Sequence, residues 1–331
     1  MRLNPIPHIW VTCRSTLVKL ILFLIATFLL EHFASAQGPL TNGFTHTGTL
    51  SIGEQETWNF AASSGDGILI KLGEAVVGSS LYPRLRLYGP NSVLLVESSS
   101  ATATEAATRA TNSGTFTVVI ANADAVAPGG NGGYRLTLAK TGTTVFVASF
   151  DEGGPMTNSA VYVATNGIAG LDLWTFNACP GDNIALQITE LTGGTDFSPE
   201  LILYAPDGTL LNRVSGATSA QINRAAPLPG NYLLIAGDTV GGYGTYQLTG
   251  SGFATGFKLC PPQIYGADLV VNAVGGRAGS NYVMLATTNV ALPMSSWTPI
   301  RTNQFGVFGE CSVTNAFNTG VPEQYFRVQT P

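Results

Sequence analysis

Three acidic residues have the side-chain chemistry of a calcium site. Asp151 and Glu152 are adjacent, and Asp172 comes shortly afterwards, just ahead of Trp174. Ca²⁺ takes several oxygen ligands, which carboxylates supply. We predict Asp151, Glu152 and Asp172 as calcium ligands, and no other cofactor. Because their spacing matches no Asp-x-Asp-x-Asp-Gly loop, solvated surface charges are the alternative.

Groups for nucleophilic catalysis are scarce. A serine or cysteine nucleophile needs a base oriented by a third group, and His46 is the only histidine after residue 36. No Gly-x-Ser-x-Gly, His-Glu-x-x-His or phosphate-loop motif occurs. Asp66 and Asp182 each follow a glycine, which favours local turn hydrogen bonds over glycoside hydrolysis. We predict no catalytic residue and no enzyme; a glycosidase-type acid pair is the minor alternative.

Three cysteines follow residue 36, namely Cys179, Cys260 and Cys311. Exported chains meet oxidising surroundings in which cysteines pair. Cys260 and Cys311 share the C-terminal segment, so we predict a disulfide between them. Pairing of Cys179 with Cys260 is the alternative, since an odd number leaves one thiol over. Without a Cys-x-x-Cys motif, a zinc site is not expected.

The N-terminus has the order of a secretory signal peptide. Basic residues without an acid precede the apolar run 20–30, and the small-residue site Ala34-Ser35-Ala36 follows it. The run is shorter than the roughly 20 residues of a membrane-spanning helix. We predict cleavage after Ala36 and a mature chain without a membrane span, secreted or at the cell surface. An uncleaved anchor is the alternative.

Composition limits the function classes. Of 331 residues, 45% are hydrophobic and 11% charged, and the formal net charge is −5. The apolar content is enough for a core, which excludes a disordered acidic chain. Nucleic-acid binding needs a basic surface, so no nucleic-acid partner is expected.

A set of motifs occurs twice. Trp58-Asn-Phe60 recurs as Trp174-Thr-Phe176, 116 residues later. The same offset relates Gly65-Asp66 to Gly181-Asp182, Leu85–Pro90 to Leu201–Pro206, and Gly114-Thr-Phe116 to Gly230-Asn-Tyr232. A period this long indicates a copied domain rather than a solenoid unit.

Within each copy, apolar and polar residues alternate, as in the series Ile184, Leu186 and Ile188. Alternation places one face of a strand in a core and the other in water. The more continuously apolar runs 116–121 and 232–236 predict central strands buried on both faces. Dense glycine and proline turns separate the segments. The pattern therefore predicts an all-β fold.

The second copy carries a recognisable motif order: Asp172-Leu-Trp174, Gly181-Asp182, Leu201–Gly208, Pro229–Tyr232 and Gly244–Leu248. This order resembles the bacterial pre-peptidase C-terminal domain, which is related to bacterial collagen-binding domains. The resemblance covers residues 44–252 and implies tandem jelly-roll-like β-sandwiches. It also implies calcium, because collagen-binding relatives hold it through acids at the domain entrance. Its motifs are turns and strands, which support a fold more than a function.

A third strand-rich segment, ending in Gln324–Val328, resembles a small C-terminal module of secreted bacterial proteins. We predict a signal peptide at 1–36, β-sandwiches at 37–142 and 143–253, a linker at 254–263, and a small Ig-like β-sandwich at 264–331.

Together these features favour an exported, non-catalytic binding or accessory protein that recognises an extracellular polymer, either a matrix protein or a polysaccharide. A structural spacer without its own ligand is the alternative. Tyr243 and Tyr246 are a further alternative as a sugar-stacking surface, although core or rim packing is favoured. The sequence indicates no oligomeric state.

Overall fold

The computed structural model describes residues 35–76, 78–122, 131–149, 151–193, 197–239, 241–266, 268–316 and 320–330. These residues form strands and connecting loops, with one 3₁₀ turn at Met294–Ser296, so the predicted all-β class is confirmed. Within the described ranges, no helix is long and apolar enough to cross a membrane. The predicted signal peptide lies outside them, except that Ser35 and Ala36 begin β1 (Ser35–Pro39).

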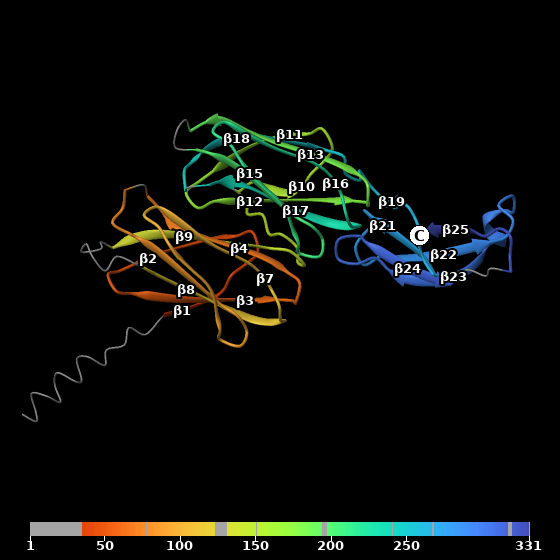
Figure 1. Ribbon diagram of the computed structural model, residues 1–331, viewed down its shortest axis with the longest axis horizontal. Coiled ribbons are helices and arrows are strands. Elements are labelled where there is room, and N and C mark those ends of the chain that lie inside the picture. The colour runs from red at the N-terminus through yellow and green to blue at the C-terminus, as the bar shows by residue number, and fades with distance from the viewer. Residues whose placement is uncertain are drawn as a thin grey trace, which may run out of the picture.

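The first sandwich consists of two sheets, named here by their central strands (Figure 1). The β8 sheet has the order β1-β3-β8-β5-β6, and the β9 sheet has the order β2-β9-β4-β7. Their strands are β2 (Thr45–Leu50), β3 (Gln55–Ala62), β4 (Gly67–Glu74), β5 (Pro83–Tyr88), β6 (Leu94–Ser99), β7 (Ala103–Arg109), β8 (Gly114–Asn122) and β9 (Gly132–Lys140).

The second sandwich has the same arrangement. Its β17 sheet has the order β10-β12-β17-β14-β15, and its β18 sheet has the order β11-β18-β13-β16. Strands β12 to β17 each begin 116 residues after β3 to β8. The strands are β10 (Gly153–Pro155), β11 (Val161–Asn166), β12 (Leu171–Ala178), β13 (Asn183–Thr192), β14 (Pro199–Tyr204), β15 (Leu210–Ser215), β16 (Ser219–Ala225), β17 (Gly230–Asp238) and β18 (Gly244–Ser251).

Each sandwich has its own core between its sheets. In the first, the rings of Phe60 and Phe116 stack with centroids 5.4 Å apart; in the second, Phe176 and Tyr232 do the same at 5.4 Å. The alternating series on β13 points its Ile and Leu side chains into the second core. Burial of these faces is the main favourable contribution to folding.

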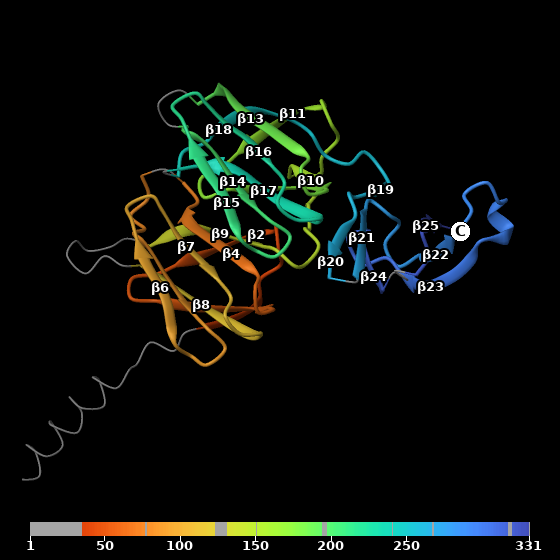
Figure 2. The same cartoon turned by 45° about the vertical axis from the view of Figure 1, so that its right-hand side comes forward.

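The two sandwiches are stacked on each other (Figures 1 and 2). The outer face of the β9 sheet packs on the outer face of the β17 sheet, where Leu69 of β4 meets a row of apolar side chains. The other members of this cluster are Ala139, Leu171, Leu173, Ile202, Tyr204, Leu233 and Ile235. Strand β17 is therefore buried on both faces, as predicted for 232–236. The same prediction for 116–121 is wrong, since Thr117 and Val119 on the outer face of β8 are half-buried.

Polar contacts also join the stacked sandwiches. Arg213 of β15 bridges Glu105 of β7 at 2.5 Å and Glu200 of β14 at 2.6 Å. The turn after β14 approaches the first sandwich so closely that a Cβ on Gly208 would lie 2.0 Å from the Gly65 carbonyl oxygen. With φ of +79°, that position requires glycine for both conformation and space.

The C-terminal sandwich is smaller. In its β21 sheet, β21 (Asp268–Val274) pairs with β24 (Cys311–Ala316) on one side and with β19 (Lys258–Leu259) and β20 (Gln263–Tyr265) on the other. The β22 sheet has the order β23-β22-β25, formed by β23 (Thr298–Gln304), β22 (Asn281–Thr287) and β25 (Tyr325–Gln329). Val271, Tyr282, Met284 and Val313 form its core.

Candidate metal centre

The structure brings the three predicted acids together. One carboxylate oxygen from each of Asp151, Glu152 and Asp172 lies within 4.8 Å of the others. Strand β10 runs parallel to β12 with Gly153 opposite Leu173. Asp151 and Glu152, which directly precede β10, therefore lie beside Asp172. The cluster therefore forms where the chain enters the second sandwich.

Asp172 is the buried member, with 3% of its surface exposed. Burial raises the pKa of its carboxyl well above the ordinary value, against the effect of a hydrogen bond from Tyr246. The Tyr246 hydroxyl donates to Asp172 Oδ2 at 2.5 Å, and Trp174 Nε1 donates to the Tyr246 oxygen at 3.3 Å. These bonds fix the Asp172 carboxylate at the inner wall of the cluster.

The other two acids are partly buried. Burial raises the pKa of both Asp151 and Glu152, and the Asp151 charge raises that of Glu152 further. The positive charge of Arg135, in the first sandwich, lowers the pKa of Asp151 and of Asp172. Three acids that repel one another are stabilised in their charged form by a nearby cation. Their hard oxygen atoms fit Ca²⁺.

The corresponding place in the first sandwich keeps only the inner part of this arrangement. Glu56 lies on β3 as Asp172 lies on β12, and the Tyr134 hydroxyl donates to it. The positions equivalent to Asp151 and Glu152 hold Ser35 and Ala36. The acid–tyrosine pair is thus common to both sandwiches, and the acidic cluster belongs to the second.

Sequence analysis missed the role of the tyrosine. Tyr246 is completely buried, so the stacking-surface alternative is wrong for it and core packing is confirmed; Tyr243 is 51% exposed. The available signal was that both partners are repeated: Tyr134-Arg-Leu-Thr137 recurs as Tyr246-Gln-Leu-Thr249, and Glu56-Thr-Trp58 recurs as Asp172-Leu-Trp174. His46, on edge strand β2, accepts a hydrogen bond from the Thr41 N–H at 3.2 Å, and burial lowers its pKa.

Asp66 and Asp182 have matching structural environments. Asp66 Oδ2 accepts from the Ser63 N–H at 2.9 Å, and Asp182 Oδ2 accepts from the Cys179 N–H at 2.9 Å. Each also forms an ion pair with a lysine: Asp66 with Lys140, the last residue of β9, at 2.8 Å, and Asp182 with Lys258 of β19 at 2.7 Å. The local turn bonds predicted for these acids are present.

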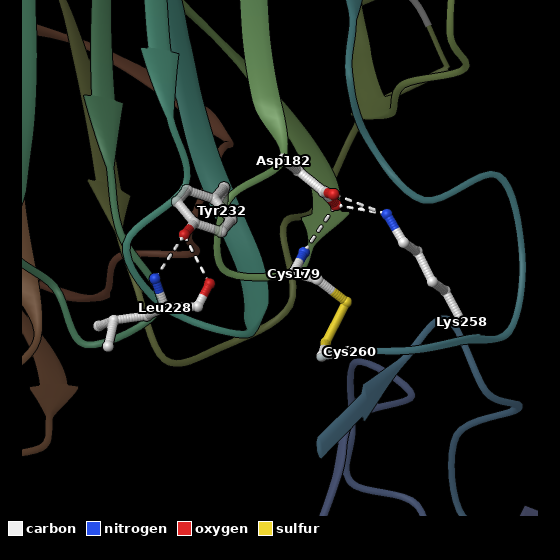
Figure 3. The surroundings of a disulfide bond; sticks show 6 residues. All are labelled: Cys179, Asp182, Leu228, Tyr232, Lys258 and Cys260. Atoms are coloured by element: carbon white, nitrogen blue, oxygen red, sulfur yellow. Dashed lines mark hydrogen bonds and ion pairs between the residues drawn. A yellow bond between two sulfur atoms is a disulfide. The ribbon is translucent and has the colours of Figure 1, made fainter. Parts of the chain in front are cut away.

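The predicted Cys260–Cys311 disulfide is wrong. Cys179 and Cys260 form the disulfide (Figure 3). Cys311 is a buried free thiol. The Cys260 N–H bonds to the carbonyl of Asn272, whereas Cys311 pairs with the next residue, Ala273. Neighbouring residues of β21 face opposite ways, so Cys260 points to the second sandwich and Cys311 into the C-terminal core.

The disulfide and an ion pair together join the second and C-terminal sandwiches. Figure 3 shows Lys258 reaching Asp182 beside the Cys179–Cys260 bond. Asp182 thus binds the backbone of its own turn and the lysine of β19 at the same time. The predicted linker 254–263 is therefore attached to the second sandwich.

Comparison with known proteins assigns no family. No family model and no curated protein matches the chain. Among solved structures, the pre-peptidase C-terminal domain of a Bacillus anthracis collagenase matches with 20% identity and a TM-score of 0.25, covering 30% of this chain and 96% of that one. Aeromonas hydrophila PliG, a periplasmic inhibitor of g-type lysozyme, matches with 17% identity and a TM-score of 0.24, covering 30% and 95%. Matches with TM-scores this low do not establish membership of either group.

Proposed function

We propose that this is an exported, non-catalytic binding protein whose second sandwich recognises an uncharged extracellular polysaccharide. The observation that carries the proposal is the outer face of the β18 sheet, called here the polar face. It consists of uncharged side chains in register on four strands: Val161, Val163, Thr165, Ala185, Gln187, Thr189, Ser219, Gln221, Asn223, Thr245, Gln247, Thr249 and Ser251.

The polar face combines hydrogen-bonding capacity with a shallow hollow. Gln187 lies opposite Gln221 on one side and Thr249 on the other, and a cavity of about 340 Å³ opens over them. Amide and hydroxyl groups donate and accept hydrogen bonds without carrying charge. Such a row matches the hydroxyl groups of a neutral sugar chain better than an ionic partner.

The equivalent face of the first sandwich has a different composition. Lys71 occupies the place of Gln187 and Glu105 that of Gln221, and both lie in the contact between the stacked sandwiches. One face of this kind is thus used to join the sandwiches, while the side chains of the polar face are uncharged and, among the described residues, exposed or half-buried. The uncharged polar face supports a binding function over that of a structural spacer.

A pull-down with insoluble, uncharged polysaccharides, namely cellulose, chitin and xylan, tests the proposal. The mature chain 37–331 is expected to be retained on one of them, and the pair Gln187→Ala and Gln221→Ala to lower its affinity about tenfold or more, since each lost hydrogen bond contributes about 1 kcal/mol. Thr57→Ala, on the outer face of the β8 sheet, is the matched control. Retention on collagen alone, or equal retention of all variants, would contradict the polysaccharide proposal.

We further propose that Asp151, Glu152 and Asp172 hold a calcium ion that secures the entrance of the second sandwich. The charge argument supports it, because a divalent cation offsets the repulsion among the acids. Free Ca²⁺ at 100 times its Kd would stabilise the folded chain by about 2.7 kcal/mol. The proposed role is structural, and Asp172 is too buried to contact a substrate.

Thermal melts in calcium and in EDTA test this site. The wild-type Tm is expected to rise by about 5 °C or more with calcium, and Asp172→Asn to remove the rise. Asp268→Asn, which removes an exposed acid elsewhere, should leave it intact. Equal melts in calcium and EDTA would remove the metal site and leave the polar face untouched.

A further inference from the structure

The C-terminal sandwich is open along one side. A groove of about 700 Å³ runs between β20 and β25, with Val271 and Met284 of the core at its floor. Leu259, Ile264 and Phe326 lie along its walls. Ile264 is 66% exposed and Leu259 43% exposed, although both face the core side of their sheet.

Both rims of this groove are strand edges. β25 pairs with β22, and β20 pairs with β21; within the described residues neither has a second strand beside it. On the opposite side, the Phe305–Glu310 connection links β23 to β24 and closes the sandwich. An unpaired edge presents backbone N–H and C=O groups to a further strand. The groove therefore lacks one strand, rather than being a pocket for a compact ligand.

Charge distinguishes between the occupants that could supply this strand. Arg327 is the one charged residue among those lining the groove, it is exposed, and no ion pair involves it in the part of the chain described. A second copy pairing antiparallel through β25 about its central residue would set Arg327 against Arg327, and like charges directly opposite are unfavourable. A strand with an acidic residue at that place pairs favourably.

We propose that this groove binds an extended peptide segment of a partner protein, which adds to β25 as a strand. Its alternate apolar side chains fill the groove beside Met284 and Ile264, and an acidic side chain on its other face pairs with Arg327. Backbone hydrogen bonds to the β25 edge provide affinity, and the apolar and acidic positions provide selectivity. This site is separate from the polar face and independent of the polysaccharide proposal.

A matched set of synthetic peptides tests the proposal on the mature chain 37–331. The probe is a blocked nine-residue peptide with alternating Val and Thr and one Asp at a Thr position. Isothermal titration is expected to show 1:1 binding, and hydrogen exchange to show slower exchange of β25 amides. A peptide with Pro in place of one Val and the neighbouring Thr loses a backbone N–H on each edge and should not bind.

Two exposed positions provide the protein variants. Arg327→Glu should weaken binding of the Asp peptide about fivefold and strengthen that of a Lys peptide, since cross-strand charge pairs act in both directions. Ile264→Asp should abolish binding of either peptide, while Val163→Asp, exposed on the polar face, should not. Each variant's fold is verified by its thermal melt. Absence of binding at 1 mM peptide, unchanged β25 exchange, or a wild-type dimer that Ile264→Asp dissociates would overturn the proposal.

Discussion

Because the folded protein keeps a proton on Asp172, its free energy of unfolding should fall as pH rises. Asp172 is 3% exposed, and burial raises the pKa of its carboxyl in the folded state well above the ordinary value. Between the unfolded pKa, near 4, and the folded pKa, the folded chain holds a proton that the unfolded chain has lost. The unfolding free energy then decreases with pH.

The size of the change in unfolding free energy follows from the single proton that Asp172 binds. Within that window, a single group changes the unfolding free energy by about 1.4 kcal/mol per pH unit. The stacked sandwiches share a buried face and are expected to unfold together, as a unit of about 200 residues. A change of 1 kcal/mol shifts the Tm of such a unit by about 2–4 °C, so Asp172 contributes about 3–6 °C per pH unit.

The assay is a thermal melt in EDTA from pH 4.5 upward, comparing the wild type with Asp172→Asn. The asparagine keeps an oxygen to accept the Tyr246 hydroxyl but does not titrate. The difference in Tm between the two chains is expected to change with pH in favour of the variant as pH rises. Glu56, Asp151 and Glu152 have pKa values raised by burial too and act in the same direction, but they remain in both chains. A Tm difference independent of pH would refute the reasoning.

Further predictions concern the joints between the sandwiches. Non-reducing peptide mapping should find Cys179 linked to Cys260; finding Cys260 linked to Cys311 would contradict the structure. Cys311 should resist alkylation in the native chain and react in denaturant, because burial both covers its thiol and raises its pKa. Leu173→Ala, in the stacked face, should lower the unfolding free energy by about 2–5 kcal/mol, while the equivalent Thr57→Ala should change it by less than about 0.5 kcal/mol; equal effects in denaturant titrations would mean that the sandwiches do not stack.

The strand pattern of each sandwich was predictable because it depends on local sequence. Leu85 and Leu87 face the core with Arg86 between them facing outward, as period-2 alternation requires. The turn roles of Asp66 and Asp182 were also local, since each carboxylate bonds to a backbone N–H three residues earlier. In such cases, the residue and its partner are close together in the chain.

The errors concern contacts between distant segments. To predict the disulfide, one must know to which side of the β21 sheet each cysteine points. This depends on the register in which β19 and β24 pair with β21. Proximity of Cys260 and Cys311 in one segment carries no information about that register. The proximity of the three acids was predicted from their position at the start of the second copy and is present, but their geometry was not predictable, because it depends on β10 pairing in parallel with β12.

The stacking explains why equivalent strands differ in sequence. The β9 sheet of one sandwich meets the β17 sheet of the other, so unlike faces are joined, and such a contact could in principle be repeated by a further copy. In the first sandwich, the outer face of the β8 sheet is equivalent to the stacked face of the β17 sheet. It has Thr57 in place of Leu173 and Arg86 in place of Ile202. Arg86 donates to Gln55 at 2.7 Å on that face, and burying it under another sandwich would cost its hydration. Substitutions of this kind end the stack at two sandwiches while preserving the strands that form each one.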